Sequence, residues 1–130
     1  MPEEVVDDAL RINARQVDSD VVLVAIAGDL DMQTVPQATA FLAQVTAITP
    51  RHLILDLSGV TFLASSGIGL LIAAQSGGEG IRGRLHLLGV TDNLPVQRPL
   101  TLVGLLDSFD IAPDLDILLA SPNTIEPLAD

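Results

Sequence analysis

Two adjacent hydroxyl side chains, Ser65 and Ser66, lie where the sequence predicts the start of a helix over residues 66–75. Serine at a helix start accepts hydrogen bonds from backbone N–H groups that have no helical partner, so both residues can be simple caps. A hydroxyl at this point also lies at the positive end of the helix dipole, which favours an anion or a group that becomes one. The pattern therefore leaves two roles open, capping or carrying an added anionic group.

The residues before these serines predict the strand that positions them. Residues 53–57 form a nearly continuous apolar run, which is typical of a strand buried on both faces. Ser58 and Gly59 predict a turn after that strand. Residues 60–63 then lead into the helix, so the whole segment is expected to be a strand, a turn and a helix.

Asp29 and Asp31 directly follow another predicted strand, the unbroken β-branched run of residues 21–27. In a parallel sheet the carboxyl ends of the strands meet at one edge, so we expect these two acids at the same edge of the sheet as Ser65. Two roles are open for them. They are solvated loop acids, or they orient a partner's Lys or Arg, or a metal that the partner brings.

A resemblance to a known family appears in these segments. Asp-Leu-Ser-Gly-Val at 56–60, Phe62 and Ser-Ser-Gly-Ile-Gly at 65–69 are similar to the signature of the STAS domain, specifically of the bacterial anti-sigma factor antagonists. Gly-Asp-Leu-Asp at 28–31 resembles the family's Gly-Glu-Leu-Asp, and the resemblance extends over most of residues 12–120. One position departs from the pattern, because Ala64 stands where the family usually has Asp.

The resemblance implies a function. Ser65 matches the serine that a partner anti-sigma kinase phosphorylates, and Ser66 would then cap the helix. The unphosphorylated form would bind an anti-sigma factor of the serine kinase type and free a sigma factor, with a serine phosphatase as a further candidate partner. The residues expected to contact the partner are Asp29, Asp31, Ala64, Ser66, Gly67, Gly69, Leu70 and Ala73. Ala64 favours an alternative, a STAS module of a lipid-transport complex or a signalling scaffold without a phosphorylation cycle.

The predicted helix itself supports a docking role. Residues 68–74 are apolar nearly all round, which is typical of a helix that is either fully buried or covered by a partner. If Leu70 or Ala73 is exposed, it belongs to an apolar patch beside Ser65. Gly67 and Gly69 have the wrong spacing for a phosphate-binding fingerprint and are expected to let another surface approach the helix start.

Other chemistry is weakly supported. Asp56 is expected to be a buried structural acid that accepts backbone hydrogen bonds, rather than a catalytic group. His52 and His86 lie in strand-like runs far apart in the sequence, and we expect ordinary satisfied histidines rather than metal ligands. No Ser-His-Asp order, metal-ligand cluster or nucleotide-binding motif is present, so we expect neither an enzyme nor a cofactor.

Composition narrows the partners and the compartment. A length of 130 residues predicts one domain, and the formal net charge of −11, with six Arg and no Lys, disfavours nucleic acid and anionic membrane surfaces. The chain has no cysteine, no signal-peptide pattern and no apolar run near the roughly 18 residues of a spanning helix. We therefore expect a cytoplasmic bacterial protein without membrane insertion.

The alternation of strands and helices predicts an α/β, STAS-like single domain with a mostly parallel central sheet of about five strands and about four helices. The predicted strands are residues 12–17, 21–27, 53–57, 84–88 and a short 108–111, and the first two form a hairpin. The predicted helices are residues 36–48, 66–75, 94–103 and 113–120, with a kink or a late start at Pro99 in the third. Residues 1–9 are expected to be a flexible acidic N-terminus, 10–120 the domain and 121–130 a tail.

Overall fold

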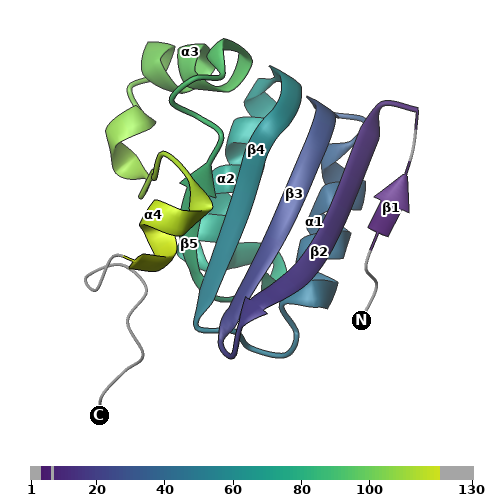
Figure 1. Ribbon diagram of the computed structural model, residues 1–130. Coiled ribbons are helices and arrows are strands. Elements are labelled where there is room, and N and C mark those ends of the chain that lie inside the picture. Colours follow the sequence, from purple (N-terminus) through teal and green to yellow (C-terminus); the bar gives the residue numbers. More distant parts are fainter. Residues whose placement is uncertain (1–3, 7, 121–130) are drawn as a thin grey trace.

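The computed structural model describes residues 4–6 and 8–120 of the chain, and Figure 1 shows their arrangement. The elements are, in order, β1 (Glu4–Val6), β2 (Leu10–Asp18), β3 (Val21–Leu30), α1 (Val35–Val45), β4 (His52–Leu63), α2 (Ser65–Ser76), η1 (Gly78–Gly80), β5 (Arg84–Leu88), α3 (Leu94–Leu102), η2 (Leu106–Ser108) and α4 (Leu115–Ala120). The predicted tail, 121–130, and residues 1–3 and 7 of the predicted N-terminal segment lie outside the described residues.

The five described strands form one sheet in the order β1-β2-β3-β4-β5. The pairs β1–β2 and β2–β3 are antiparallel, and β3–β4 and β4–β5 are parallel. The predicted α/β class is confirmed, and the predicted hairpin is β2–β3. Residues 4–6 of the segment that was expected to be flexible form β1 and pair with β2. Three residues are too few to show a strand's alternation in the sequence.

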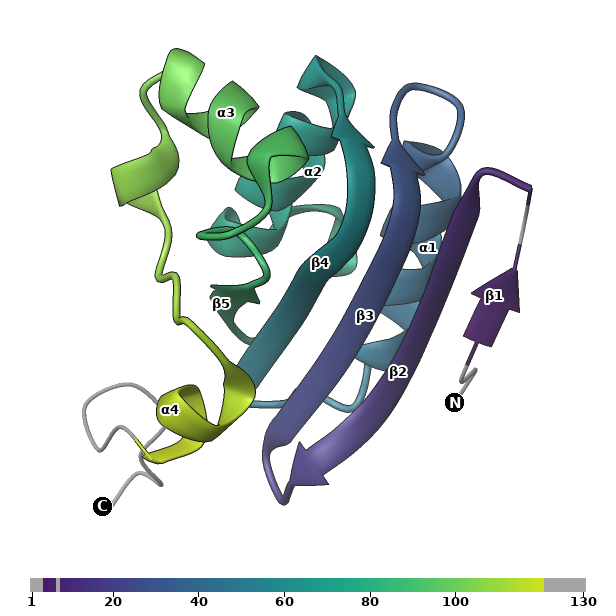
Figure 2. The same ribbon diagram turned by 45° about the horizontal axis from the view of Figure 1, so that its top comes forward.

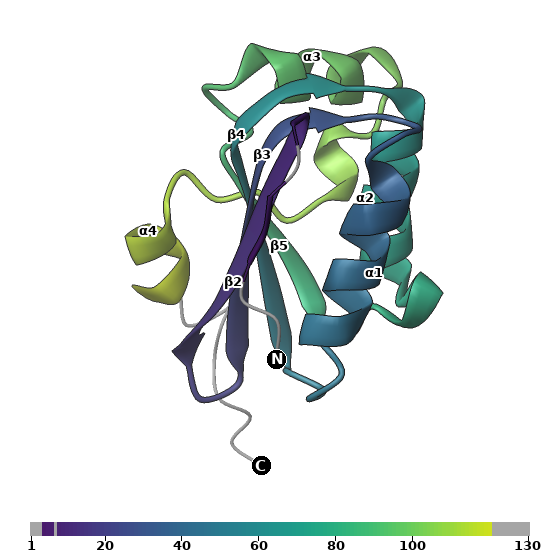
Figure 3. The ribbon, with the colours of Figure 1, turned by 90° about the vertical axis from the view of Figure 1, so that its right-hand side faces the viewer.

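Helices α1 and α2 cover one face of the sheet, and the short α4 lies on the other face (Figure 3). The main core lies under α1 and α2, and a smaller apolar cluster under α4 includes Leu23, Ile54 and Leu118. Along the first part of β2, buried and exposed residues alternate, so that Ile12 lies in the core while Arg11 points away from it. Helix α3 packs against β4 at the end of the sheet where α2 begins (Figure 2).

Strand β4 is longer than predicted. It runs without a turn from His52 to Leu63, so the turn expected at Ser58 and Gly59 is wrong. Instead the β3–β4 register shifts twice, once between Ala25 and Ala27 and once between Gly28 and Asp29. A β-carbon at Gly59 would lie 2.7 Å from Cβ of Ala27. Ser58 and Gly59 therefore belong to a β-bulge rather than to a turn. A bulge favours the same residue types, because it also needs a local bend and a close approach of neighbouring strands.

Two expectations near the C-terminus also change. The strand expected at 108–111 is only a single bridge, in which Ile111 pairs with Leu87, and residues 106–108 form η2. Helix α3 starts at Leu94 and continues through Pro99, so a late start is wrong. Tertiary contacts of β4 with α3 hold this helix despite the proline's missing N–H group.

Candidate functional site

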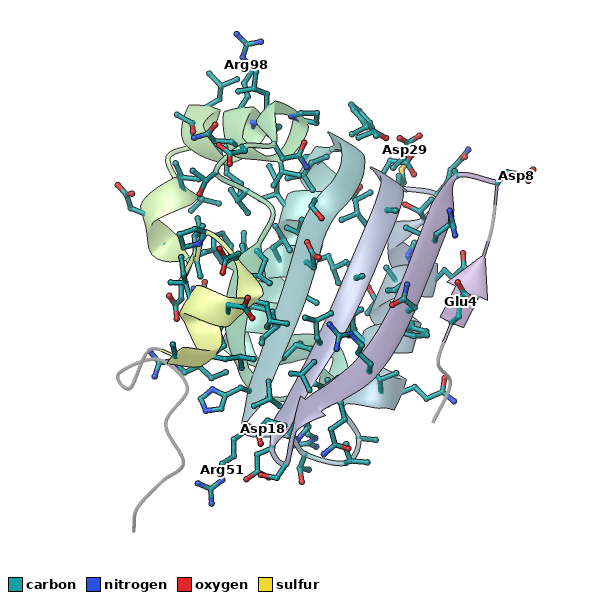
Figure 4. The ribbon with its side chains drawn as sticks, viewed as in Figure 1. Glu4, Asp8, Asp18, Asp29, Arg51 and Arg98 are labelled. Atoms are coloured by element: carbon teal, nitrogen blue, oxygen red, sulfur yellow. The ribbon has the colours of Figure 1, made fainter. Side chains whose placement is uncertain are left out.

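The site lies where β3 and β4 end side by side. Leu30 pairs with Leu63 across the two parallel strands, and the backbone N–H of Ala64 donates to the carbonyl oxygen of Leu30 at 2.9 Å. Helix α2 begins at the next residue, Ser65. The expected meeting of Asp29 with this helix start at one edge of the sheet is therefore correct, and Figure 4 shows Asp29 at that end of β3.

The start of α2 is capped differently from the prediction. The N-cap residue is Ala64, in an extended conformation (φ −85°, ψ 175°), and it has no side-chain cap. Its carbonyl accepts the first helical hydrogen bond, from the N–H of Ile68 at 3.0 Å. Ser65 and Ser66 are the first two helical residues, so the expectation that Ser66 caps the helix is wrong. The helix begins one residue earlier than the serine pattern indicated.

The Ser65 side chain is exposed and makes no hydrogen bond or ion pair with any residue in 4–6 and 8–120. Ser66 is half-buried. The first-turn N–H groups of α2 lack a side-chain acceptor, because alanine occupies the cap. A free hydroxyl therefore lies beside uncapped N–H groups at the positive end of the helix dipole.

Burial divides the predicted contact residues of α2 into two sets. Leu70 is only 3% exposed and Gly67 is buried, which disfavours a direct contact of these two residues with a partner. A β-carbon at Gly67 would lie 2.8 Å from the carbonyl oxygen of Leu30, so the surface that approaches this glycine is β3 itself. Gly69 is exposed with open space around it, and Ala73 is half-buried.

Asp31 has a structural role in the loop that links β3 to α1. One of its carboxylate oxygens accepts hydrogen bonds from the N–H groups of Gln33 at 2.9 Å and Thr34 at 3.1 Å. The hydroxyl of Thr34 in turn donates to the carbonyl oxygen of Asp29 at 2.7 Å. This Asx-type turn fixes the loop, which supports the local role for Asp31 over a contact role.

The Asp29 carboxylate is half-buried and accepts one hydrogen bond, from the Thr61 hydroxyl at 3.2 Å. Because a carboxylate has about four acceptor sites, Asp29 retains capacity for a cation or a donor from another molecule. Of the two acids at this edge, Asp29 is therefore the better candidate for a partner contact.

Exposed apolar side chains surround the helix start, and the sequence reasoning missed most of them. Phe62 is 52% exposed and Ile72 is 44% exposed, and Met32 and Leu94 are also exposed. An open cleft runs beside Phe62 and is lined by Thr61, Phe62, Leu63, Leu94, Pro95, Arg98 and Pro99. In the sequence Phe62 stands out only as a motif residue. The bulge in β4 breaks the alternation of buried and exposed residues, so the sequence pattern does not show that Phe62 points outward.

Asp56 accepts a hydrogen bond from the N–H of Ser58 at 3.0 Å, as expected of a structural acid, although it is half-buried rather than fully buried. The sequence reasoning missed Asn93, whose side-chain amide donates to the carbonyl oxygens of Leu57 at 2.9 Å and Val60 at 3.0 Å. It thus satisfies two carbonyl oxygens of β4 that lie beyond Asp56, the last residue of β4 to pair with β5. A lone Asn in a predicted loop gives no sequence signal for such a distant role.

His52 and His86 are satisfied histidines, as expected, but they are not independent. Nδ1 of His52 lies 3.0 Å from Nε2 of His86, and Nδ1 of His86 lies 2.7 Å from Oδ2 of Asp110. Burial lowers the pKa of both imidazoles. Within 4–6 and 8–120, no group of three or more His, Cys, Asp or Glu side chains is placed to hold a metal ion.

No helix among the described residues is both long enough and apolar enough to cross a membrane.

Comparison with known proteins agrees with this geometry. An anti-sigma-F factor antagonist of Mycobacterium tuberculosis, RsfB, is 32% identical over 89 residues, which are 68% of this chain and 70% of that protein. An anti-sigma-B factor antagonist of Staphylococcus aureus is 29% identical over 84 residues, 65% of this chain and 76% of that protein. The crystal structure of an anti-sigma factor antagonist from Mycobacterium paratuberculosis superposes with a TM-score of 0.73 at 29% identity, covering 88% of this chain and 94% of that one. The family model of the STAS domain matches residues 11–117, and the chain belongs to the STAS domain family.

Proposed function

We propose that this protein is an anti-sigma factor antagonist. In its unphosphorylated form it binds an anti-sigma factor of the serine kinase type, which then releases a sigma factor. Phosphorylation of Ser65 by that kinase ends the binding. The proposal is supported by the names of the relatives and, above all, by one observation: the Ser65 hydroxyl is exposed and without a hydrogen-bond partner in the described chain, at the first position of α2.

The docking surface is defined here as the exposed residues Phe62, Ser65, Gly69 and Ile72. On α2, positions 65, 69 and 72 are four and three residues apart, so they follow one face of the helix. Phe62 and Ile72 supply apolar area, and glycine at position 69 allows another backbone to come close. We call these four residues the Ser65 surface. The net charge of −11 suits a partner whose facing surface is basic.

A phosphoryl group on Ser65 adds about −1.5 to −2 charges and three acceptor oxygens. Within the domain the cost is small, because the uncapped start of α2 stabilises an anion by roughly 0.3–1 kcal/mol. Repulsion by Asp29 at the same edge opposes this gain. At the interface the same group would be buried without a partner, which costs several kcal/mol. Phosphorylation therefore acts on binding far more than on the fold.

The role needs no cofactor and no catalysis by this chain, and its place is the bacterial cytoplasm, where sigma factors act. Asp29 offers the partner a carboxylate beside the Ser65 surface, and Ala64, Ser66 and Ala73 border it. A serine phosphatase would restore the binding form.

The test is phosphorylation by candidate anti-sigma factors of the kinase type with Mg-ATP, read by intact mass and peptide mapping. Wild type is expected to gain one phosphoryl group, mapped to Ser65. The Ser65→Ala variant is expected to gain none, and the matched Ser66→Ala variant to react like wild type. A phosphate on Ser66 would overturn the assignment.

Ala64 keeps the alternative open, since an acid at this position is usual in the family. In that alternative the Ser65 surface docks the domain into a lipid-transport complex or a signalling scaffold, without phosphorylation. If an anti-sigma factor binds the protein but none of the kinases tested adds a phosphoryl group, the result would favour antagonism without a phosphorylation cycle. If the protein shows neither binding nor phosphorylation, the result would favour the alternative.

A further inference from the structure

Helix α3 buries one face and leaves large side chains exposed on the other. Val96 and Leu100 are buried in the main core. Leu94, Arg98 and Leu102 are spaced four residues apart, so they follow one another along the exposed face of the helix. Leu94 is 64% exposed and Leu102 is 79% exposed. We call Leu94, Arg98 and Leu102 the α3 stripe.

No residue in 4–6 and 8–120 gives the Arg98 guanidinium an ion pair or a hydrogen bond. The sequence has no Asp or Glu between Asp92 and Asp107, so the α3 stripe is a region of positive charge in a chain with a net charge of −11. Exposed large apolar side chains around an arginine are typical of a protein–protein interface. The α3 stripe is therefore a surface that can bind another molecule.

A second group of exposed side chains lies across a cleft from the α3 stripe. Phe62 lines this cleft on the β4 side, and Leu94 and Arg98 line it on the α3 side. Asp29 pairs with Phe62 across β3 and β4, and Met32, in the loop after β3, is 80% exposed. We call Asp29, Met32 and Phe62 the strand-end group. Asp29 and Arg98 lie at the same end of the molecule (Figure 4).

The α3 stripe and the strand-end group are complementary to each other. Each combines two apolar side chains with one charge, which is the guanidinium of Arg98 in the stripe and the carboxylate of Asp29 in the strand-end group. The Asp29 carboxylate accepts only one hydrogen bond, from Thr61, so it retains acceptor sites for a guanidinium. Because one chain carries both groups, two copies related by a two-fold axis would present each group to the other.

The same charges disfavour a direct pairing of two α3 helices. Arg98 is the middle residue of the α3 stripe, so two stripes packed antiparallel about this residue would bring two guanidinium groups together. Like charges that face each other in an interface weaken binding. The strand-end group, with its carboxylate, is the better complement of the α3 stripe.

We propose that the protein forms a two-fold symmetric dimer in which the α3 stripe of each copy packs on the strand-end group of the other, with Arg98 paired to Asp29. The contact is small, so the dimer is weak and depends on protein concentration. Phe62 also belongs to the Ser65 surface, so the dimer would exclude a partner from that surface. This consequence rests on the proposed function, whereas the dimer itself does not.

Sedimentation velocity of the full chain, at concentrations from about 10 µM to about 1 mM, tests the dimer, because an interface below the standard size binds weakly. Wild type is expected to change from monomer to dimer over this range. A protein that stays monomeric at every concentration would overturn the proposal. Growth beyond two copies would also overturn it, because a two-fold contact closes at the dimer.

Two charge reversals break the proposed pair from either side. Asp29→Lys and Arg98→Glu each set like charges against each other in both contacts, so each is expected to weaken the dimer at least about tenfold. Leu102→Asp, which places a charge on the apolar part of the stripe, is expected to do the same. Arg82→Glu is the matched control, because Arg82 is exposed and precedes β5, at the edge of the sheet opposite to the end of β4. If Arg82→Glu weakens the dimer as much as Arg98→Glu, net charge governs association and the proposal is wrong.

A mixture of the two reversals tests the symmetry of the dimer. In a heterodimer of Asp29→Lys with Arg98→Glu, each of the two contacts again joins opposite charges, so the mixture is expected to dimerise although neither variant does so alone. The doubly substituted protein is expected to dimerise as well. A mixture of Asp116→Lys with Arg82→Glu has the same net charges at remote exposed sites and is expected to associate no more tightly than wild type. Absence of rescue in the first mixture would rule out the pairing of Arg98 with Asp29.

The same samples separate this inference from the proposed function. When a candidate anti-sigma factor is added, it is expected to bind the monomer and to reduce the dimer fraction of wild type. A protein that dimerises but binds no anti-sigma factor would remove the proposed function and leave the dimer. A protein that binds an anti-sigma factor but never dimerises would remove the dimer and leave the proposed function.

Discussion

The hydrogen bond from the Ala64 N–H to the Leu30 carbonyl continues the pairing of β3 and β4 one residue beyond the end of β4. It fixes the N-cap of α2 to the neighbouring strand. Ser65, the next residue, therefore projects from backbone that is part of the sheet on one side and of a helix on the other. A residue held between two rigid elements can change its charge without moving its surroundings.

The first prediction concerns the charge at position 65. Ser65→Asp is expected to weaken binding of the cognate anti-sigma factor more than a hundredfold, which is about 3 kcal/mol, because it buries a charge at the interface. Ser65→Ala is expected to bind like wild type. Titration calorimetry measures both affinities, and thermal melts of the three proteins are expected to agree closely. If Ser65→Asp binds as tightly as wild type, the proposed switch is ruled out.

The second prediction separates the two faces of α2. Leu70→Ala is expected to lower the free energy of unfolding by about 2–5 kcal/mol, because it opens a cavity in the core. Ile72→Asp, on the exposed face, is expected to change it by about 0.5 kcal/mol or less and to abolish partner binding. Urea unfolding and binding assays on both variants check this. The assignment of faces fails if Leu70→Ala unfolds like wild type.

The third prediction uses two glycines of the same helix. A β-carbon at Gly67 would lie 2.6 Å from Cδ1 of Leu63, so Gly67→Ala is expected to destabilise the fold by about 1–3 kcal/mol. No heavy atom lies within 4 Å of a β-carbon at Gly69, so Gly69→Ala is expected to stabilise it by about 0.5–1 kcal/mol. Urea midpoints of the two variants should therefore move in opposite directions. Shifts of the same sign would contradict the packing of the helix start.

The fourth prediction concerns the vacant cap. Ala64 has the backbone conformation of an N-cap residue but no side-chain oxygen, so Ala64→Asp is expected to stabilise the fold by about 1 kcal/mol. Ala64→Asn is the uncharged control and should give a similar gain. The carboxylate introduced by Ala64→Asp would also compete with the phosphoryl group for the same N–H groups, so the phosphorylation rate is expected to change more than partner affinity. Unchanged melting temperatures for both variants would show that the missing side-chain cap does not limit the stability of the fold.

Much of the site could be predicted from the sequence because its elements are encoded locally. The apolar runs at 21–27 and 53–57 predict buried strands, and β3 and β4 contain them. Once these strands are parallel, chain geometry alone brings Asp29 and the start of α2 to one edge. The prediction of α4 is also close, because Pro113 and Asp114 are strong start signals; the Asp114 carboxylate accepts from the N–H of Ile117 at 2.9 Å.

Only the tertiary structure decided which face of α2 is buried. Residues 68–74 are apolar on every side, so periodicity could not choose between Leu70, in the core, and Ile72, at the surface. The choice comes from the close approach of Gly67 to Leu30, a contact between residues that are far apart in the sequence. The bulges of β4 and the pairing of His52 with His86 arise in the same way, because strand register depends on partners distant in the sequence. Sequence alone determined which residues are near Ser65, and packing determined which of them face outward.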